Sequence, residues 1–168
     1  KWDDLTEPIP GPTTKLMQEL AKKHQMVIVV PMYEEDLPGI YYNSAAVVDA
    51  DGSYLGKFRK IHIPHCAPGF WEKFYFKPGD TGFRVFQTRY AKLGVGICWD
   101  QWFPEAARSM ALLGADILLY PTAIGWDPRD TDAEKSRQRD AWITVQRAHA
   151  IANGLPVTMV PFGQVPKV

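Results

Sequence analysis

The chain has 168 residues, of which 46% are hydrophobic and 23% charged, enough for one domain with a substantial core. Its 19 Lys and Arg residues balance 19 Asp and Glu residues, which argues against a nucleic acid or a membrane surface as partner. We expect no membrane span, because no apolar run approaches the necessary length of roughly 18 residues. Two cysteines are too few for a disulfide framework, so we expect a reducing, cytoplasmic setting.

The first third of the chain predicts a helix, a strand and a hairpin. Residues 15–23 carry apolar side chains at helical spacing. Residues 26–30 are apolar and mostly β-branched, a pattern typical of a strand buried on both faces. An Asp-Gly dipeptide separates two strand-like runs, residues 40–48 and 54–58, and this is a strong hairpin signal.

The rest of the chain alternates between strands and helices. We expect strands at residues 82–88, 92–98, 117–120 and 157–160, a helix from Pro104 to Gly114, a polar loop at 127–135, and a helix at 136–152. Proline suits the first helical position, where its missing N–H has no helical partner. Because no linker or repeat interrupts the pattern, residues 1–168 predict a single α/β domain, a mixed sheet with outer helices.

Cys98 ends an apolar strand and precedes a short aromatic turn and the helix that begins with proline. A thiol held there is well placed as a nucleophile, and a helix N-terminus or nearby cations would lower its pKa. On the strand pattern alone, Cys98 could equally be a buried core thiol.

Lys60 and Glu72 precede this cysteine in the chain and offer a cation and a carboxylate. Lys60 follows a strand edge, and Glu72 lies in an aromatic-rich loop. Taken alone, each could be an ordinary solvated residue. Together with a thiol they suit chemistry at a carbonyl, because a fixed cation stabilises developing negative charge and a carboxylate moves protons.

Several segments resemble the nitrilase superfamily of carbon–nitrogen hydrolases, in the family's order and over nearly the whole chain. They are Tyr42-Asn43-Ser44, Asp51-Gly52, residues 58–64, residues 72–80, residues 94–100 and Phe103-Pro104-Glu105. Those around Glu72 and Cys98 look most like the N-carbamoylputrescine amidohydrolases of this family. The resemblance implies an α-β-β-α sandwich, here incomplete at both ends.

The resemblance also implies a mechanism and a reaction. Cys98 would attack an amide-type carbonyl, while Lys60 and the backbone N–H of Trp99 stabilise the oxyanion. Glu72 would position the substrate or Lys60, and water would hydrolyse the covalent intermediate. The implied reaction converts N-carbamoylputrescine to putrescine, carbon dioxide and ammonia, a step of polyamine biosynthesis. It needs no metal or other cofactor, and relatives of this kind lead us to expect a homo-oligomer.

The resemblance places the general-base glutamate upstream of the first helix, ahead of residue 1. Glu34 and Glu35 follow a later strand and match a different family position, so neither is assigned this role. We therefore expect this chain to be a fragment lacking both ends, and to be inactive or nearly so by itself.

Substrate specificity is expected to depend on residues just beyond the nucleophile. Family members that bind a substrate carboxylate place arginines at the positions of Gln101 and Trp102. An uncharged, aromatic lining instead tolerates an amine or an alkyl chain. The expected substrate-binding residues are Trp99, Gln101, Trp102 and Ala123. Asp100 and Glu105 are expected to be structural.

Several alternatives remain open from the sequence. Within the family, the substrate could be another carbamoyl amine, an ω-amide or a nitrile, or the chain could keep the fold without the chemistry. His62, His65 and Cys66 are too close together, and lack a fourth ligand, for a zinc site. A Cys–His protease using His62 or His149 is conceivable, but no protease signature surrounds Cys98.

Overall fold

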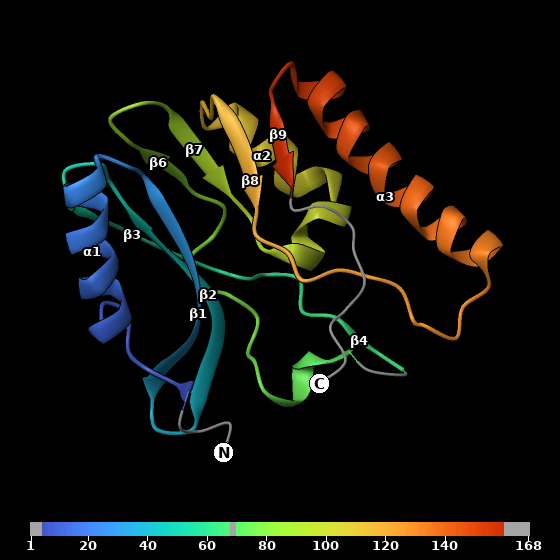
Figure 1. The fold of residues 1–168 in the computed structure, drawn as a ribbon, viewed down its shortest axis with the longest axis horizontal. Coiled ribbons are helices and arrows are strands. Elements are labelled where there is room, and N and C mark those ends of the chain that lie inside the picture. Colours follow the sequence, from blue (N-terminus) through green and yellow to red (C-terminus); the bar gives the residue numbers. More distant parts are fainter. Residues whose placement is uncertain (1–4, 68–69, 160–168) are drawn as a thin grey trace.

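The computed structural model describes residues 5–67 and 70–159, which form two main sheets flanked by helices (Figure 1). The first part of the chain comprises α1 (Pro12–His24), β1 (Ile28–Leu37), β2 (Ile40–Val48), β3 (Tyr54–Arg59), β4 (His65–Cys66), β5 (Phe70–Trp71) and the 3₁₀ helix η2 (Glu72–Phe74). The second part comprises β6 (Val85–Gln87), β7 (Lys92–Val95), the 3₁₀ helix η3 (Cys98–Trp102), α2 (Pro104–Leu112), β8 (Ile117–Tyr120), α3 (Asp132–Asn153) and β9 (Val157–Met159).

The first sheet is an antiparallel β1-β2-β3 arrangement covered by α1. The predicted hairpin is confirmed, because β2 and β3 pair across the Asp-Gly turn, and Gly52 there has a φ of 90° that favours glycine. Helix α1 packs on β1 and β2 through its apolar side, and Ala21 is fully buried. Gln18 fixes the helix to the hairpin by donating from Nε2 to the Gly52 carbonyl oxygen at 2.8 Å.

The second sheet has the order β6-β7-β8-β9, with an antiparallel β6–β7 pair and parallel pairing from β7 to β9. The two parallel connections contain α2 and α3, as expected for helices that cross over a sheet. Helix α2 begins at Pro104, confirming the predicted start.

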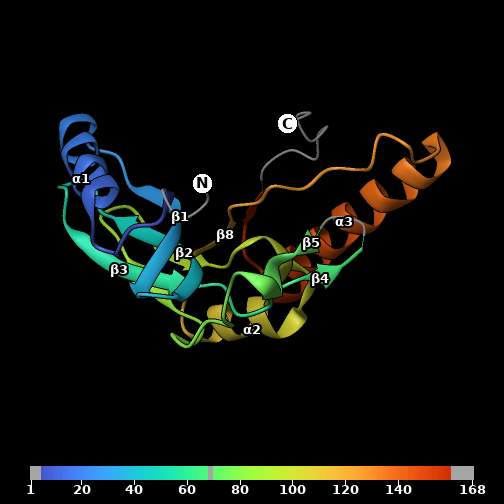
Figure 2. The same cartoon turned by 90° about the horizontal axis from the view of Figure 1, so that it is seen from below.

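Two hydrophobic clusters establish the order of the layers. One joins the sheets face to face, with Ala45, Val47 and Phe58 from the first sheet against Phe86, Leu93, Val95 and Ile97. The other joins β8 to α2, through Leu118 and Tyr120 against Ala107 and Met110. The result is an α-β-β-α sandwich, with α1 and α3 at opposite ends of the molecule in Figures 1 and 2. This confirms the predicted fold class.

The structure corrects the boundaries of β1. The strand runs to residue 37 rather than ending near residue 30, and its residues are mostly half-buried rather than enclosed on both faces. Its polar second half pairs with β2 down to the Leu37–Ile40 register, beyond the apolar run visible in the sequence. Strand pairing therefore extends the element where side-chain hydrophobicity does not indicate it.

Helix α3 begins at Asp132, so the second half of the predicted loop at residues 127–135 is its first turn. Thr131 caps the helix, because its side chain accepts a hydrogen bond from the Glu134 N–H at 3.2 Å. A further salt bridge joins Arg137 and Glu134 at 2.6 Å across one turn. At the other end of the chain, residue 160 of the predicted last strand lies outside the described residues.

No helix in the described part of the chain has both the length and the apolar character needed to cross a membrane.

Candidate active site

Three sequence-predicted residues, Cys98, Lys60 and Glu72, line one cavity of about 280 Å³. Lys60 directly follows β3 of the first sheet, Glu72 begins η2, and Cys98 begins η3 after β7 of the second sheet. The cavity therefore forms where the ends of both sheets meet. Its remaining lining residues are Pro31, Asn43, Ile97, Pro121, Thr122 and Ala123.

Lys60 is a buried cation held by a carboxylate. Its Nζ donates to Glu72 Oε2 at 2.6 Å, and only 1% of the residue is exposed. The Lys60 N–H donates to the Asn43 carbonyl oxygen at 2.8 Å, which fixes the backbone beneath the ammonium group. Lys60 is thus not a solvated strand-end lysine, and Glu72 occupies the position needed to orient it.

The backbone at Cys98 adopts an unusual conformation. Its φ of 45° lies in the left-handed region, which costs a residue with a Cβ about 1 kcal/mol. The Cys98 N–H donates to the Pro121 carbonyl oxygen at 2.9 Å, and the Ala123 N–H donates to the Cys98 thiol. Hydrogen bonds from the segment after β8 therefore hold both the backbone and the sulfur of Cys98.

The expectation of a lowered thiol pKa is wrong. Burial raises the pKa of Cys98 above its ordinary value, and the nearby Glu72 carboxylate raises it further, while Lys60 acts in the opposite direction. No α-helix begins at this thiol, because Cys98 starts the five-residue 3₁₀ helix η3 and α2 begins only at Pro104. The neutral thiol is therefore the resting form at neutral pH, and nucleophilic attack requires a proton acceptor.

The four residues expected to bind substrate fall into different environments. Ala123 lines the cavity that contains Cys98. Trp99 and Trp102 instead line a second cavity of about 280 Å³, together with Ile124, Gly125 and residues of α3. The two cavities share the segments after β7 and after β8, whose consecutive residues line first one cavity and then the other.

Gln101 does not line either cavity, contrary to its expected role. Its side chain is fully buried against α3, where Oε1 accepts hydrogen bonds from Trp142 Nε1 and Gln146 Nε2, each at 2.8 Å. The Gln101 carbonyl oxygen also pairs with His149 Nε2 at 2.7 Å. The hydrogen bonds to α3 fix the direction of this side chain, and sequence alone could not assign that direction.

The alternative catalytic and metal roles of the histidines find no support in the described residues. His149 pairs with Gln101, and His62 pairs with Asp100 through Nδ1 at 2.7 Å; neither lines the cavity of Cys98. Over residues 5–67 and 70–159, His, Cys, Asp and Glu form no group of three able to hold a metal ion. Asp100 has the structural role expected of it, with its carboxylate fully buried.

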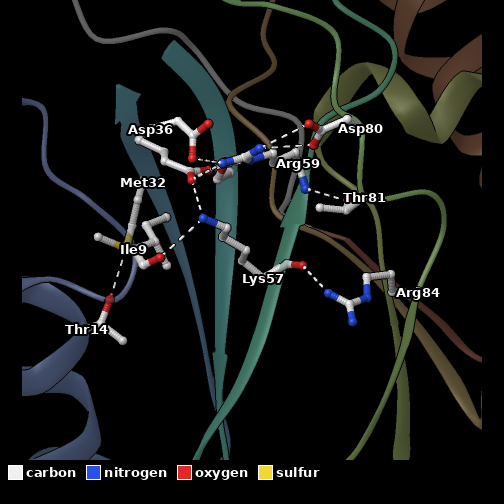
Figure 3. Close-up of polar contacts among 11 residues, drawn as sticks. Ile9, Thr14, Met32, Asp36, Lys57, Arg59, Asp80, Thr81 and Arg84 are labelled. Atoms are coloured by element: carbon white, nitrogen blue, oxygen red, sulfur yellow. Dashed lines mark hydrogen bonds and ion pairs between the residues drawn. The ribbon is translucent and has the colours of Figure 1, made fainter. Parts of the chain in front are cut away.

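Glu34 is buried in an ionic cluster on the first sheet, which sequence patterns did not indicate. Figure 3 labels its partners Lys57 and Arg59, together with Asp36 and Asp80. Arg59 donates to both of its carboxylate oxygens, at 2.6 and 3.0 Å, and Lys57 also pairs with it. Arg59 also donates hydrogen bonds to Asp36, at 2.6 Å, and to Asp80, at 3.0 Å. Because cations and Ser44 occupy both oxygens, Glu34 is a structural carboxylate rather than the proton acceptor for Cys98.

Gly96 directly follows β7 and allows the backbone to pass close to a buried aromatic ring two residues before Cys98. A Cβ at this position would lie 2.5 Å from Tyr120 Cε1, and Tyr120 is itself enclosed. We expect Gly96→Ala to lower the free energy of unfolding by about 2–3 kcal/mol, measured by urea denaturation.

Gly39→Ala is the control for Gly96→Ala, because a methyl group there would meet nothing within 4 Å. Only its φ of 82° opposes the substitution, at a cost of about 1 kcal/mol. Equal losses in the two variants would contradict the steric argument.

Comparison with known proteins gives consistent results. The carbon–nitrogen hydrolase family matches residues 1–164. The chain is 57% identical to the N-carbamoylputrescine amidase of Solanum lycopersicum over 152 residues, covering 90% of this chain and 49% of that protein. It is 52% identical to the citrullinase of Francisella tularensis over 158 residues, covering 94% of this chain and 54% of that protein.

Solved structures show the same similarity in three dimensions. A carbon–nitrogen hydrolase from Helicobacter pylori G27 matches with a TM-score of 0.83 and 54% identity, covering 86% of this chain and 49% of that chain. A nitrilase-superfamily member from Saccharomyces cerevisiae matches with a TM-score of 0.69 and 27% identity, covering 91% and 52%. The chain thus spans about half the length of the relatives that it matches.

Proposed function

Since this chain belongs to the carbon–nitrogen hydrolase family, we propose that its protein hydrolyses the ureido group of N-carbamoylputrescine. One observation carries the proposal: the Lys60–Glu72 ion pair and the Cys98 thiol share a cavity in a chain 57% identical to an N-carbamoylputrescine amidase. With one water, the reaction yields putrescine, carbon dioxide and ammonia.

Attack by the Cys98 sulfur on the carbamoyl carbon forms a C–S bond and places negative charge on the carbonyl oxygen. The Lys60 ammonium group and the Trp99 backbone N–H stabilise that oxyanion. The thiol proton passes to a carboxylate base and from there to the departing nitrogen, whose bond to the carbamoyl carbon breaks as the carbonyl group re-forms. Water then attacks the covalent intermediate, the C–S bond breaks to regenerate the thiol, and the carbamic acid that is released decomposes to carbon dioxide and the remaining amine.

Glu72 holds the Lys60 ammonium group in place during these steps. The 2.6 Å ion pair orients a side chain that would otherwise sample several rotamers. Such preorganisation is valuable because the charge that Lys60 stabilises develops only in the transition state.

Ala123, Trp99 and Trp102 are proposed to contact the part of the substrate beyond the ureido group. Ala123 borders Cys98, and the two tryptophans line the adjacent cavity, where the charge of Arg137 is paired with Glu134. Methylene groups pack well on indole rings, and indole faces attract an alkylammonium ion. This lining supports an aminobutyl chain.

A second candidate substrate is citrulline, favoured by the 52% identity to a citrullinase. Citrulline carries the same ureido group on an alkyl chain but ends in both an ammonium and a carboxylate. The chemistry at Cys98 would be the same, so only contacts to the far end of the substrate distinguish the two reactions.

We place the reaction in polyamine biosynthesis, within the cytoplasm. Both cysteines are free, and Cys66 is exposed, as suits a reducing compartment. A homo-oligomer is supported by exposed apolar side chains on the outer helices, Leu112 and Leu113 at the end of α2 and Ile151 on α3.

A panel of ureido compounds tests the proposal. We expect N-carbamoylputrescine to show the highest kcat/KM and N-butylurea, which lacks only the terminal amine, to be at least about tenfold poorer. Putrescine and ammonia release are measured by chromatography and a coupled assay.

The other outcomes of this panel are equally informative. A higher kcat/KM with citrulline than with N-carbamoylputrescine would identify citrulline as the substrate. Absence of turnover of every compound by the protein to which this chain belongs would contradict the proposed activity.

A further inference from the structure

A single buried carboxylate joins the two segments that carry the reactive groups. Lys60 leaves the first sheet and Cys98 leaves the second, so their separation depends on how the sheets are held together at this end. His62 lies two residues after Lys60, and Asp100 lies two residues after Cys98. These two residues contact one another directly.

The Asp100 carboxylate is fixed by bonds from both segments. Oδ1 accepts the backbone N–H of His62 at 2.9 Å and pairs with His62 Nδ1 at 2.7 Å. Oδ2 accepts the backbone N–H of Ile97 at 3.0 Å. Asp100 has no exposed surface, so these bonds set the distance between the backbone after Lys60 and the backbone before Cys98.

His62 is itself held by stacking. Its ring lies parallel to that of Phe103, with centroids 3.6 Å apart and an interplanar angle of 8°. Because a carboxylate oxygen can only accept a hydrogen bond, Nδ1 of His62 must carry a proton. The imidazole therefore connects Asp100 on one side with the segment between η3 and α2 on the other.

Neither residue lines the Cys98 cavity, so neither is placed to touch substrate. An apolar contact between the sheets would also bring the Lys60 and Cys98 segments together, but such a contact has no preferred direction. Hydrogen bonds to a buried carboxylate fix both distance and orientation, and a displacement of about 1 Å in an active site can cost about 100-fold in rate.

We infer that the Asp100–His62 contact positions the nucleophile turn against Lys60, so that both are positioning residues for chemistry at Cys98. The inference rests on the proposed function for its role in turnover, but the contact also controls the reactivity of the thiol itself. Lys60 favours the thiolate, while Glu72 and Asp100 oppose it. Displacing Lys60 from Cys98 should therefore reduce the thiolate population.

Two substitutions of His62 separate the hydrogen bond from the stacking. His62→Asn keeps an N–H donor near the Nδ1 position but removes the ring. His62→Phe keeps a ring for Phe103 but removes the donor. If the hydrogen bond positions the turn, Cys98 in His62→Asn should react at nearly the wild-type rate, and Cys98 in His62→Phe should react more slowly.

The measurement is the rate of Cys98 alkylation by iodoacetamide between pH 6 and 10, followed by peptide mass spectrometry. We expect His62→Phe to slow alkylation about tenfold at pH 7.5, as follows from a thiol pKa higher by about one unit. His62→Asn should stay within about threefold of the wild type. The exposed Cys66 of the same molecule is the internal reference and should react at an unchanged rate.

Other results would overturn the inference. Unchanged Cys98 alkylation in His62→Phe, or equal slowing in both variants, would assign His62 a packing role only. Circular dichroism checks that each variant is folded. If His62→Phe fails to fold, His62→Leu replaces it, because leucine is close in size to asparagine but has no donor; unchanged alkylation there would also reject the inference.

The alkylation assay needs no substrate, which separates this inference from the proposed function. Slower alkylation of Cys98 in His62→Phe, combined with no turnover of any ureido compound, would support the positioning role and reject the proposed activity. In an active preparation, we expect kcat to fall about tenfold in His62→Phe with little change in KM.

Discussion

Cys98→Ala is expected to reduce hydrolysis of N-carbamoylputrescine by about 10⁴-fold or more, because it removes the atom that forms the covalent intermediate. Alanine retains the Cβ, so the strain associated with the φ of 45° is the same in both proteins. The loss therefore reports the missing sulfur rather than a relaxed backbone. Putrescine release under saturating substrate measures the effect.

Cys66→Ser is the matched control for this variant. Cys66 is exposed on the β4 strand and lies outside the Cys98 cavity, so activity should change by less than about twofold. Mass spectrometry of quenched reactions should find the substrate-derived adduct on the peptide containing Cys98. Retention of more than about 1% of activity in Cys98→Ala would require a different nucleophile.

Glu34→Gln is expected to lower the free energy of unfolding by about 3 kcal/mol, a large fraction of the 5–15 kcal/mol typical of a domain. The substitution preserves the side-chain shape but removes the charge shared by Arg59 and Lys57. Both cations would then lack their buried counter-ion, although Arg59 keeps Asp36 and Asp80. Urea denaturation at pH 7 measures the loss.

Glu35→Gln is the control for this experiment, because the neighbouring side chain points away from the cluster and is only half-buried. We expect a change of less than about 0.5 kcal/mol. Equal effects at the two positions would show that the buried ion pairs contribute nothing measurable to stability.

The effect of Glu34→Gln should also depend on pH. Burial raises the pKa of Glu34, but hydrogen bonds from Arg59, Lys57 and Ser44 outweigh it, so the net pKa lies below the ordinary value. A lowered pKa in the folded state stabilises the protein above the unfolded-state pKa, about 4.3, and that contribution disappears as the pH falls through the folded value. The difference between wild type and variant should be constant from pH 8 to about 5 and shrink below that range.

Local sequence signals identified most elements because they act over a few residues. An Asp-Gly turn predicts the β2–β3 hairpin, and Pro104 marks the start of α2, since both depend on backbone geometry at a single site. The same signals failed in polar segments. The second half of β1 is a strand through pairing with β2, and the first turn of α3 was mistaken for a loop.

The three residues that share the cavity could be predicted from the sequence only by considering several motifs together. Lys60, Glu72 and Cys98 each have an ordinary alternative when considered singly, and their order along the chain matches a family. Neither the cavity that they share nor the 2.6 Å Lys60–Glu72 bond can be derived from spacing. Those features depend on how two sheets meet.

The amino-acid sequence alone thus decides most local elements and the family, and it singles out Cys98 as the candidate nucleophile. The tertiary structure decides the environment of each group: the raised pKa of Cys98, the direction of the Gln101 side chain toward α3, and the burial of Glu34 among cations. The physical reason is that backbone preferences are local, whereas desolvation and charge pairing arise from residues distant in the chain. For the Cys98 thiol, the neighbour that most favours the charged form is Lys60, which follows a strand of the opposite sheet.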